Sequence, residues 1–433
     1  MAKVLKFGRW VRNNWKKSVF FSVACYYGGS FIKTEFDKNS LVRQYSKEAV
    51  KFGDVSLPVF QSPRHILVIL NPAANKKKAL KEYEKYCAPL LHLSGAKITL
   101  LQSSDEYGLV QLTKAISEDV DAVVVAGGDG AISEVITGIF YQKMNNSLSL
   151  DVPLGIIPVG RSNTIAKKLY SAGNSTGSDA LDRVKLMMDA TYSIVRELTF
   201  PSNVIEAQTF GEKESTFKPV YTLGHLQWGA LRDAREKMDK YWYFGGFRQY
   251  AAYVFGSNFN SPFEMKIQFT PPCSGCSKCY KDRFDKTQRK EKPENRRWWH
   301  AFVPRTSSRD PKIPIINYET IHNENCDKME EKSINSVELI VSPEILDGTP
   351  SLRVQIGPKS LSYTDFVKEG CSREHPASSA LKNDELYAQN LYVIPNESQE
   401  ENSSKFSIAG EIYETSPIKV SLLHKVLPMF SPS

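Results

Sequence analysis

Short apolar runs alternate with segments of helical spacing between His65 and Phe200. Apolar runs of this length are typical of buried strands, whereas apolar residues spaced three and four apart indicate amphipathic helices. The alternation predicts a parallel sheet covered by helices, because parallel neighbours need a crossover connection. The predicted strands are 65–71, 97–102, 121–126 and 154–157, and the predicted helices are 79–93, 109–116, 132–140, 165–170 and 180–190.

After Phe200 the pattern becomes one of short apolar stretches separated by polar loops, which predicts a β-rich second domain. Residues 271–335 contain Pro, Lys, Arg, Glu and Asn with little periodicity, so we interpret them as a long insertion. The predicted strands of this domain are 217–223, 263–269, 337–341, 352–356, 391–394 and 418–423.

The N-terminal segment is basic and contains no acidic residue before Glu35. Its apolar residues Val4, Phe7, Trp10 and Val11 fall on one face of a helix, which is typical of a mitochondrial signal or a membrane-surface helix. The apolar stretch 18–32 is shorter than the roughly 20 residues that span a bilayer. We favour an uncleaved mitochondrial signal that also anchors the protein to a membrane; the alternative is a flexible basic leader.

Chain length constrains the number of domains, and net charge constrains the kind of partner. A chain of 433 residues predicts two domains and an appendage, which we place at 1–60 (targeting and membrane association), 61–199 and 200–433. The net charge of +8 fits nucleotides, phospholipid surfaces or nucleic acid, and no nucleic-acid-binding motif is present.

The third predicted strand runs directly into a glycine-rich loop, Gly127-Gly128-Asp129-Gly130. Glycines let the backbone approach phosphates and adopt positive φ, and the N-terminus of the following helix favours an anion. Asp129 is placed to hold Mg²⁺, whose charge would offset that of the phosphates. The alternative is a tight turn in which Asp129 only caps a helix. The sequence fits neither a P-loop nor a dinucleotide fingerprint.

Two other strand ends carry similar loops. Asn71-Pro-Ala-Ala-Asn75 follows the first strand and precedes three lysines, and Pro158-Val-Gly-Arg-Ser-Asn163 follows the fourth. The carboxyl ends of parallel strands line one crevice, so we expect the three loops to meet the same nucleotide. Asn71, Gly160 and Asn163 are therefore candidates for nucleotide binding.

These three loops together resemble the diacylglycerol kinase catalytic domain, whose superfamily includes bacterial diacylglycerol kinases, sphingosine kinases and ceramide kinases. The segments 88–95, 228–233 and 240–245, with the basic N-terminus, are more specifically similar to the mitochondrial acylglycerol kinase family. The resemblance covers most of the chain and is weak across residues 271–335.

The resemblance implies an α/β nucleotide domain and a C-terminal β-sandwich that helps to form a lipid cleft. It implies ATP, Mg²⁺ and phosphorylation of monoacylglycerol or diacylglycerol, with ceramide as a further acceptor, at a mitochondrial inner membrane facing the intermembrane space. The family also includes a subunit of the inner-membrane carrier translocase. The family's motifs map onto Gly127, Gly128, Asp129, Gly130 and Glu134 for phosphate, onto Trp228, Gly229 and Asp233 near the lipid, and onto the late acid Glu411.

Several positions depart from the family pattern. Ala131 stands where Thr is usual, which removes one hydroxyl donor, and Ala409 replaces the Asp of an Asp-Gly-Glu motif. Arg161 and Ser162 stand where Thr and Gly often occur. These changes favour phosphate binding mainly through backbone amides. Either Glu411 or Asp129 is the expected base toward the lipid hydroxyl.

Cys273, Cys276 and Cys279 form two overlapping C-x-x-C units within the insertion. A structural zinc site needs four ligands, and the fourth is not obvious, with Cys326, His300 and His322 as distant candidates. We therefore interpret the cluster as an incidental or disulfide-forming loop.

Two other functions compete with a lipid kinase. A soluble NAD kinase-like or phosphofructokinase-type enzyme would also use a Gly-Gly-Asp-Gly loop, although the N-terminal anchor and the 228–233 element favour a lipid. A membrane-anchored import or assembly factor would keep the fold with dispensable kinase activity.

Overall fold

The structure is a computed structural model, and it describes residues 15–55, 62–103, 108–117, 119–144, 152–170, 179–210, 218–256, 262–279, 320–373, 383–396 and 405–431. The chain forms two compact units. The first comprises residues 1–131, 145–200 and 429–433, and the second comprises 132–144 and 201–428.

A parallel sheet forms the centre of the first unit, in the strand order β2-β1-β3-β4. Each strand is a short run of aliphatic residues, and β1, β3 and β4 are almost wholly buried, as expected for a sheet covered on both faces. The strands are β1 (His65–Leu70), β2 (Lys97–Gln102), β3 (Ala122–Ala126) and β4 (Leu154–Ile157), which confirms all four predictions.

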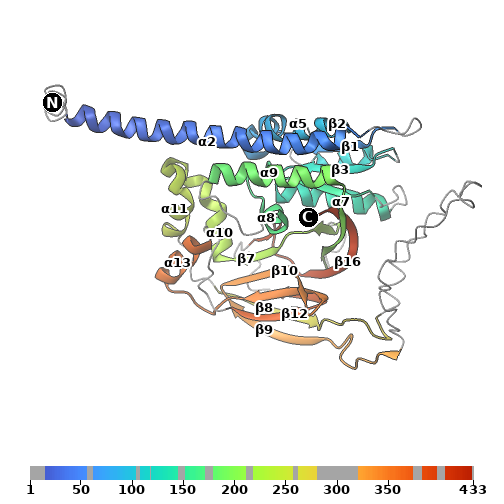
Figure 1. Ribbon diagram of the computed structural model, residues 1–433. Helices are drawn as coiled ribbons and strands as arrows, with labels where there is room; N and C mark the ends of the chain where they lie inside the picture. The colour runs from blue at the N-terminus through green and yellow to red at the C-terminus, as the bar shows by residue number, and fades with distance from the viewer. Residues whose placement is uncertain are drawn as a thin grey trace, which may run out of the picture. The chain divides into compact units, whose positions relative to one another are not determined.

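Helices cover this sheet, and α2, α5 and α9 pack into one core with alternate residues of β1 and β3. Figure 1 shows α9 running alongside the C-terminal part of α2. The predicted helix 79–93 is continuous but contains a π-helical segment. The helical elements of this unit are α2 (Trp15–Gly53), α3 (Ala74–Lys77), α4 (Ala79–Glu82), η1 (Tyr83–Cys87), α5 (Ala88–Leu93), α6 (Leu109–Leu112), η2 (Thr113–Ala115), α8 (Thr164–Tyr170) and α9 (Asp179–Arg196).

Three elements belong to both units. Helix α7 (Asp129–Met144) begins in the first unit and continues from Ile132 in the second. Strand β5 (Thr199–Thr209) passes into the second unit at Pro201, and β16 (Ile418–Phe430) returns to the first at Met429, which pairs with Leu154.

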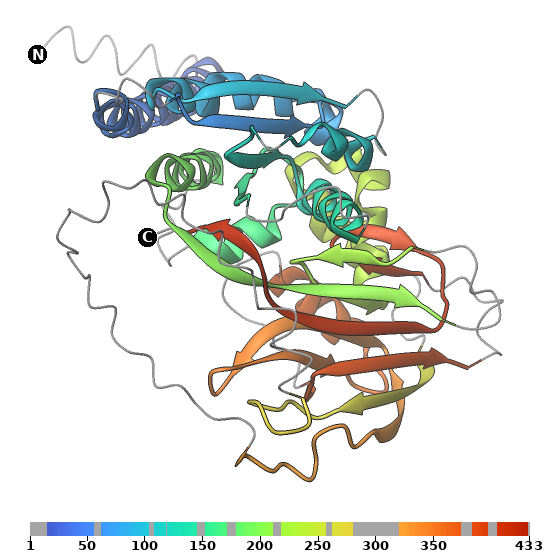
Figure 2. The ribbon, with the colours of Figure 1, turned by 90° about the vertical axis from the view of Figure 1, so that its right-hand side faces the viewer.

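The second unit is built from two antiparallel sheets. One has the order β6-β5-β16-β13-β8-β9, and in Figure 2 its β5 and β16 appear as adjacent green and red strands. The other has the order β12-β11-β10-β7-β14-β15. The remaining strands are β6 (Val220–Thr222), β7 (Leu226–Gly229), β8 (Phe263–Thr270), β9 (Glu330–Ser336), β10 (Glu338–Leu346), β11 (Thr349–Ile356), β12 (Asp384–Ala388), β13 (Asn390–Pro395), β14 (Phe406–Ile408) and β15 (Glu411–Tyr413).

The inner faces of the two sheets share one hydrophobic core. Trp228 of β7 stacks on Phe263 of β8 and lies against Phe406 of β14, so aromatic residues from both sheets meet at its centre. The helical elements of this unit, besides the greater part of α7, are α10 (Ala230–Glu236), η3 (Lys237–Phe247), α11 (Arg248–Val254) and α13 (Tyr363–Arg373).

The predicted fold class, an α/β domain with a parallel sheet followed by a β-sandwich, is confirmed. The predicted list of strands is incomplete, because it lacks β5, β7, β9, β12, β14 and β15. Strand β9 lies inside the predicted insertion 271–335, because its sequence is mostly polar and exposed and gives no apolar signal. Strand β7 was missed because it contributes only four residues and ends at Gly229.

Candidate active site

The carboxyl ends of β1, β3 and β4 lie at one edge of the parallel sheet. Asn71, Gly127 and Pro158 are the first residues beyond these strands, so their three loops share that edge. The strand order reverses direction between β1 and β3, and ligands of open α/β sheets bind at such a switch point. The expectation that the three loops share one edge is confirmed.

Glycines allow the second and third loops to touch backbone to backbone. A Cβ atom on Gly160 would lie 2.2 Å from the Cα atom of Gly128, and one on Gly128 would lie 2.7 Å from the carbonyl oxygen of Ser162. The Gly160 N–H donates to the carbonyl of Gly127 at 3.1 Å. Gly127, Gly128, Gly130 and Gly160 are not among the glycines with positive φ. Of the two properties that glycine allows, positive φ is not used here, and at Gly128 and Gly160 the requirement is close approach between loops.

Asp129 ties these two loops together through its buried carboxylate, which is only 3% exposed. Its Oδ2 accepts hydrogen bonds from Ser162 Oγ at 2.8 Å and from the Thr164 hydroxyl and N–H at 2.7 and 2.9 Å. Its Oδ1 accepts from the Ile165 N–H at 3.0 Å. Asp129 therefore caps α8, a helix of the neighbouring loop, where a carboxylate also stabilises the positive end of the helix dipole.

The two asparagines at this edge differ in what their side chains do. Asn71 Oδ1 accepts from the Ala73 N–H at 2.9 Å, which holds the turn after β1. Asn163 donates from Nδ2 to the carbonyl of Gly160 at 3.0 Å, while its buried Oδ1 has no hydrogen-bond partner within the described parts of the chain. A buried acceptor without a donor is unfavourable, so Asn163 Oδ1 is suited to accept a bond from a ligand.

A charged pair, not predicted from the sequence, connects the first loop to the third. Arg183 of α9 donates to Glu82 Oε2 at 2.7 Å and to the carbonyl of Gly160 at 3.1 Å. Asn75 Nδ2 donates to the same Glu82 oxygen at 3.2 Å. The pairing joins residues 101 positions apart, so no local sequence signal reveals it.

The lysine run after Asn71 adopts an unusual backbone. Asn75, Lys76 and Lys77 have φ of 52°, 54° and 64°, in the left-handed region that non-glycine residues avoid. Strain of this kind is found where a local structure is fixed by its surroundings, often at binding sites. The turn follows β1 closely and carries three exposed lysines, whose positive charge would attract anionic phosphates.

In the second unit, Trp228 and Gly229 have evident structural roles. Trp228 is 1% exposed in the sandwich core. Gly229 has a φ of 123°, and a Cβ atom there would lie 2.2 Å from the carbonyl oxygen of Val337, so only glycine fits. Nothing tests their predicted contact with substrate, and it stays a prediction.

Asp233 lies on α10 beside a buried arginine. Arg232, which is 6% exposed, donates to Asp233 Oδ1 at 2.7 Å, to Glu236 at 2.5 Å and to the carbonyl of Lys405 at 2.7 Å. Burial raises the pKa of Asp233 above its ordinary value, although the Arg232 charge opposes that shift. The Asp233 carboxylate is therefore paired with Arg232 and partly shielded from solvent.

The two remaining acids predicted for the site lie on α7 and on a tight hairpin. Glu134 falls about one turn after Asp129 and Gly130 along α7. Glu411 begins β15 and is exposed. Between β14 and β15, Ala409 and Gly410 both have positive φ, at 50° and 91°, as a two-residue hairpin turn requires. Asp suits such a turn better than Ala does, which explains the family's Asp-Gly-Glu pattern in physical terms.

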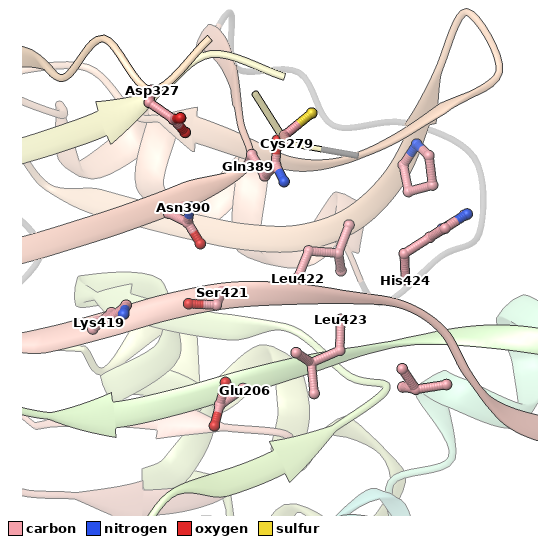
Figure 3. A pocket seen from close by; sticks show the side chains of 12 residues that line it. Glu206, Cys279, Asp327, Gln389, Asn390, Lys419, Ser421, Leu422, Leu423 and His424 are labelled. Carbon is pink, nitrogen blue, oxygen red and sulfur yellow. The ribbon is translucent and has the colours of Figure 1, made fainter. Parts of the chain in front are cut away.

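A cavity of about 360 Å³ in the second unit contains none of the predicted site residues. Figure 3 shows Asn390, Gln389, Lys419 and Ser421 around it, with Cys279 and Asp327 at one side. Much of the lining is polar or charged, which does not suit an acyl chain.

Comparisons with known proteins agree with this architecture. The family model for the diacylglycerol kinase catalytic domain matches residues 65–195, and that for the acylglycerol kinase C-terminal region matches 223–433. Mitochondrial acylglycerol kinase of Homo sapiens is 29% identical over 98% of this chain and 96% of its own. Sphingosine kinase 1 of Homo sapiens is 27% identical over 42% of this chain and 46% of its own.

Among solved structures, a diacylglycerol kinase from Bacillus anthracis str. Sterne superposes with a TM-score of 0.48 and 15% identity, covering 86% of this chain and 98% of that one. The two family models lie end to end along the chain, one on the α/β unit with its phosphate-type loops and the other on the β-sandwich. The chain therefore combines a diacylglycerol kinase catalytic domain with an acylglycerol kinase C-terminal region, and it is an ATP-dependent lipid kinase.

Proposed function

We propose that the enzyme transfers the γ-phosphate of ATP to the hydroxyl of monoacylglycerol and diacylglycerol, giving lysophosphatidic and phosphatidic acid. The observation that carries the proposal is the match of the second unit to the acylglycerol kinase C-terminal family, beside a matched diacylglycerol kinase catalytic domain. Ceramide is a further candidate acceptor, since sphingosine kinases are related to the first unit.

In this proposal the three joined loops hold the nucleotide. Backbone N–H groups of the glycine loops and the side chain of Asn163 bind ATP, and the lysines after Asn71 neutralise its phosphates. Phosphoryl transfer depends mostly on positioning and charge. Loops that are already bonded to one another before ATP binds need little reorganisation to provide that positioning. The nucleotide-binding set is Asn71, Gly127, Gly128, Gly130, Glu134, Gly160 and Asn163.

Mg²⁺ would offset the phosphate charge, and Asp129 is the acid within the glycine loop. Its two oxygens already accept hydrogen bonds from Ser162, Thr164 and Ile165. Because Mg²⁺ usually keeps several waters in such sites, we propose that Asp129 acts on that water shell and fixes the loops. Its main role is then that of a positioning residue.

This assignment makes Glu411 the better candidate for the base. The Asp129 carboxylate is buried and accepts hydrogen bonds from backbone and hydroxyl donors, and Glu411 stands at a solvent-accessible position at the start of β15. A base must come within hydrogen-bond reach of the proton that it removes. The proposed substrate-side residues are Glu411, Asp233, Trp228 and Gly229.

Replacing Glu411 by glutamine is expected to lower kcat by about 10²-fold or more with little change in KM for ATP, because a neutral amide cannot take the proton. Transfer of radiolabelled phosphate should be measured with monoacylglycerol, diacylglycerol, ceramide and NAD as separate acceptors.

The matched control is Glu414→Gln, which removes an exposed acid three residues away and should leave kcat unchanged. Unchanged kcat in Glu411→Gln would return the role of base to Asp129. Wild-type transfer to NAD in place of lipid would contradict the proposed substrate class.

We further propose that the enzyme associates with the mitochondrial inner membrane, facing the intermembrane space. Its relatives are named mitochondrial. In the described chain, no helix has the length and apolar character needed to cross a bilayer. The first half of α2 nevertheless exposes Phe20, Phe31, Ile32 and Phe36, each about 70% exposed. Exposed aromatic residues beside basic ones are typical of helices that lie in the membrane interface.

The triple substitution Phe31→Ser, Ile32→Ser, Phe36→Ser is expected to reduce binding to cardiolipin-containing vesicles by about tenfold or more, since each side chain loses apolar burial in the interface. Vesicle co-sedimentation measures the effect. Ile345→Ser, which removes an exposed aliphatic residue from β10, serves as the control and should bind as the wild type does. Equal binding of the triple variant would exclude α2 as the membrane-binding element.

A second role, as a subunit of the inner-membrane carrier translocase, is also proposed. The same exposed face of α2 would suit a membrane-embedded partner, and the role would not need kinase activity. Affinity purification from mitochondria should recover translocase subunits equally with wild type and Asp129→Asn if the two roles are separate. Failure to recover them with either protein would contradict this role.

A further inference from the structure

Four cysteines converge at one end of the β8–β9 pair. Cys273, Cys276 and Cys279 follow β8, and Cys326 precedes β9. Their Sγ atoms all lie within 4.8 Å of one another, each residue is at most 7% exposed, and none of the four is in a disulfide. Cys326, one of the distant candidates, therefore completes the set of four that the local spacing left open.

The distances between the sulfur atoms match one particular arrangement. Cys276 Sγ lies 3.8 Å from Cys279 Sγ, which lies 3.8 Å from Cys273 Sγ. Four thiolates around one zinc ion at about 2.3 Å form a tetrahedron with edges of about 3.8 Å. A disulfide would need about 2.0 Å. A cluster of several irons binds its cysteines on different irons and so holds them further apart.

A side-chain amide supplies a hydrogen bond to one of these sulfurs. Asn323 Nδ2 donates to Cys273 Sγ at 3.3 Å. Donors aimed at sulfur stabilise the thiolate form, which is the form that binds metal, and such contacts orient the ligands of a metal site.

The other candidate ligands do not compete for this position. His322 is exposed, and its Nδ1 lies 3.3 Å from Ser277 Oγ, so its ring is directed to a hydroxyl. His300 lies outside the described residues. The Ser277 N–H donates to the carbonyl of Ile321 at 2.9 Å, which fastens the cysteine turn to the segment that carries Cys326.

We propose that Cys273, Cys276, Cys279 and Cys326 bind a single Zn²⁺ ion as a structural tetrathiolate site. The ion would close the long connection between Cys279 and Cys326 at its base and hold the ends of β8 and β9 together. Closing a long loop removes conformational freedom from the unfolded chain, so metal binding and folding of this region are coupled. The role is independent of the proposed substrate.

Elemental analysis of the full chain, purified under reducing conditions, tests the proposal. We expect about one zinc per chain in the wild type and less than about a tenth in Cys326→Ser, because three thiolates without the fourth bind weakly. Cys371→Ser is the matched control: it removes a half-buried thiol of the same unit and should retain the zinc.

Cobalt substitution gives a second readout that does not depend on activity. Co²⁺ in the wild type should show the visible bands and the sulfur-to-metal charge transfer of a tetrahedral tetrathiolate. Cys326→His keeps a fourth ligand and should still bind the ion, with the spectrum shifted by one nitrogen donor. This variant also keeps the test valid if Cys326→Ser does not fold. Zinc content that is equal in wild type and Cys326→Ser, or the recovery of these cysteines as disulfides without metal, would overturn the proposal.

Discussion

Asp129→Asn is expected to reduce kcat/KM for lipid phosphorylation by more than about 10³-fold. The substitution removes the negative charge beside the glycine loop. It also replaces one carboxylate oxygen by an NH₂ group, which would face either the Ile165 N–H or the Ser162 and Thr164 donors that bond to the carboxylate. A donor facing a buried donor costs about 1–3 kcal/mol, so the loop that carries Asn163 should shift. Radiolabelled phosphate transfer measures the loss.

Thr164→Val separates the two contributions to this effect. It keeps the carboxylate and removes one hydroxyl that donates to Asp129 Oδ2 at 2.7 Å. We expect an activity loss of about tenfold, with nucleotide affinity lowered and unfolding little changed. Full activity of Asp129→Asn would show that neither the charge nor the connection between the loops is needed. A loss as severe in Thr164→Val would show that the connection alone accounts for the effect.

Arg373→Met is expected to destabilise the second unit by about 3–5 kcal/mol. Arg373 ends α13 and donates to both oxygens of Glu338, at 2.6 and 2.7 Å, and to Glu369 at 2.7 Å. Both glutamates are only 1% exposed. Burial disfavours the arginine charge, but the two carboxylates outweigh that effect and raise the pKa of Arg373 above its ordinary value. Without the arginine, two buried carboxylates would lack their counter-ion.

Denaturant unfolding monitored by tryptophan fluorescence measures this change, since Trp228 lies in the core of the same unit. Arg353→Met is the control. Arg353 also pairs with two glutamates, Glu344 and Glu385, but this cluster is 30–39% exposed. Surface pairs contribute about 0–1 kcal/mol, so the control should lose little stability. Equal losses in the two variants would contradict the role given to burial.

The sequence was sufficient to predict the strands of the first unit and the edge at which its loops meet. Continuous aliphatic runs such as 122–126 have few alternatives to a buried strand, and the topology of parallel sheets then brings their ends together. The β-sandwich was predicted by family resemblance, because its strands are short and several, such as β9, are mostly polar.

The contacts within the site could not be predicted, because they join distant parts of the chain. Nothing near Asp129 in the sequence indicates that Thr164 and Ile165 will be its partners. The glycine pattern predicted flexibility in φ, whereas Gly128 and Gly160 are needed so that two loops can touch. Cys326 was likewise only one of several candidates until the β8–β9 pairing brought it to the other cysteines.

Helix α2 combines the proposed membrane-binding face with residues of the first unit's core. Leu41, Val42 and Tyr45 pack against the first unit's core, and Tyr45 donates to Asp189 of α9, whereas Phe31, Ile32 and Phe36 are exposed. The helix has 39 residues, a length of about 58 Å, without an intervening hinge loop. A protease that removed everything up to Gly53 would therefore remove part of the core with the leader. A shortened enzyme that begins just after Phe36 should keep its fold and lose its membrane contact.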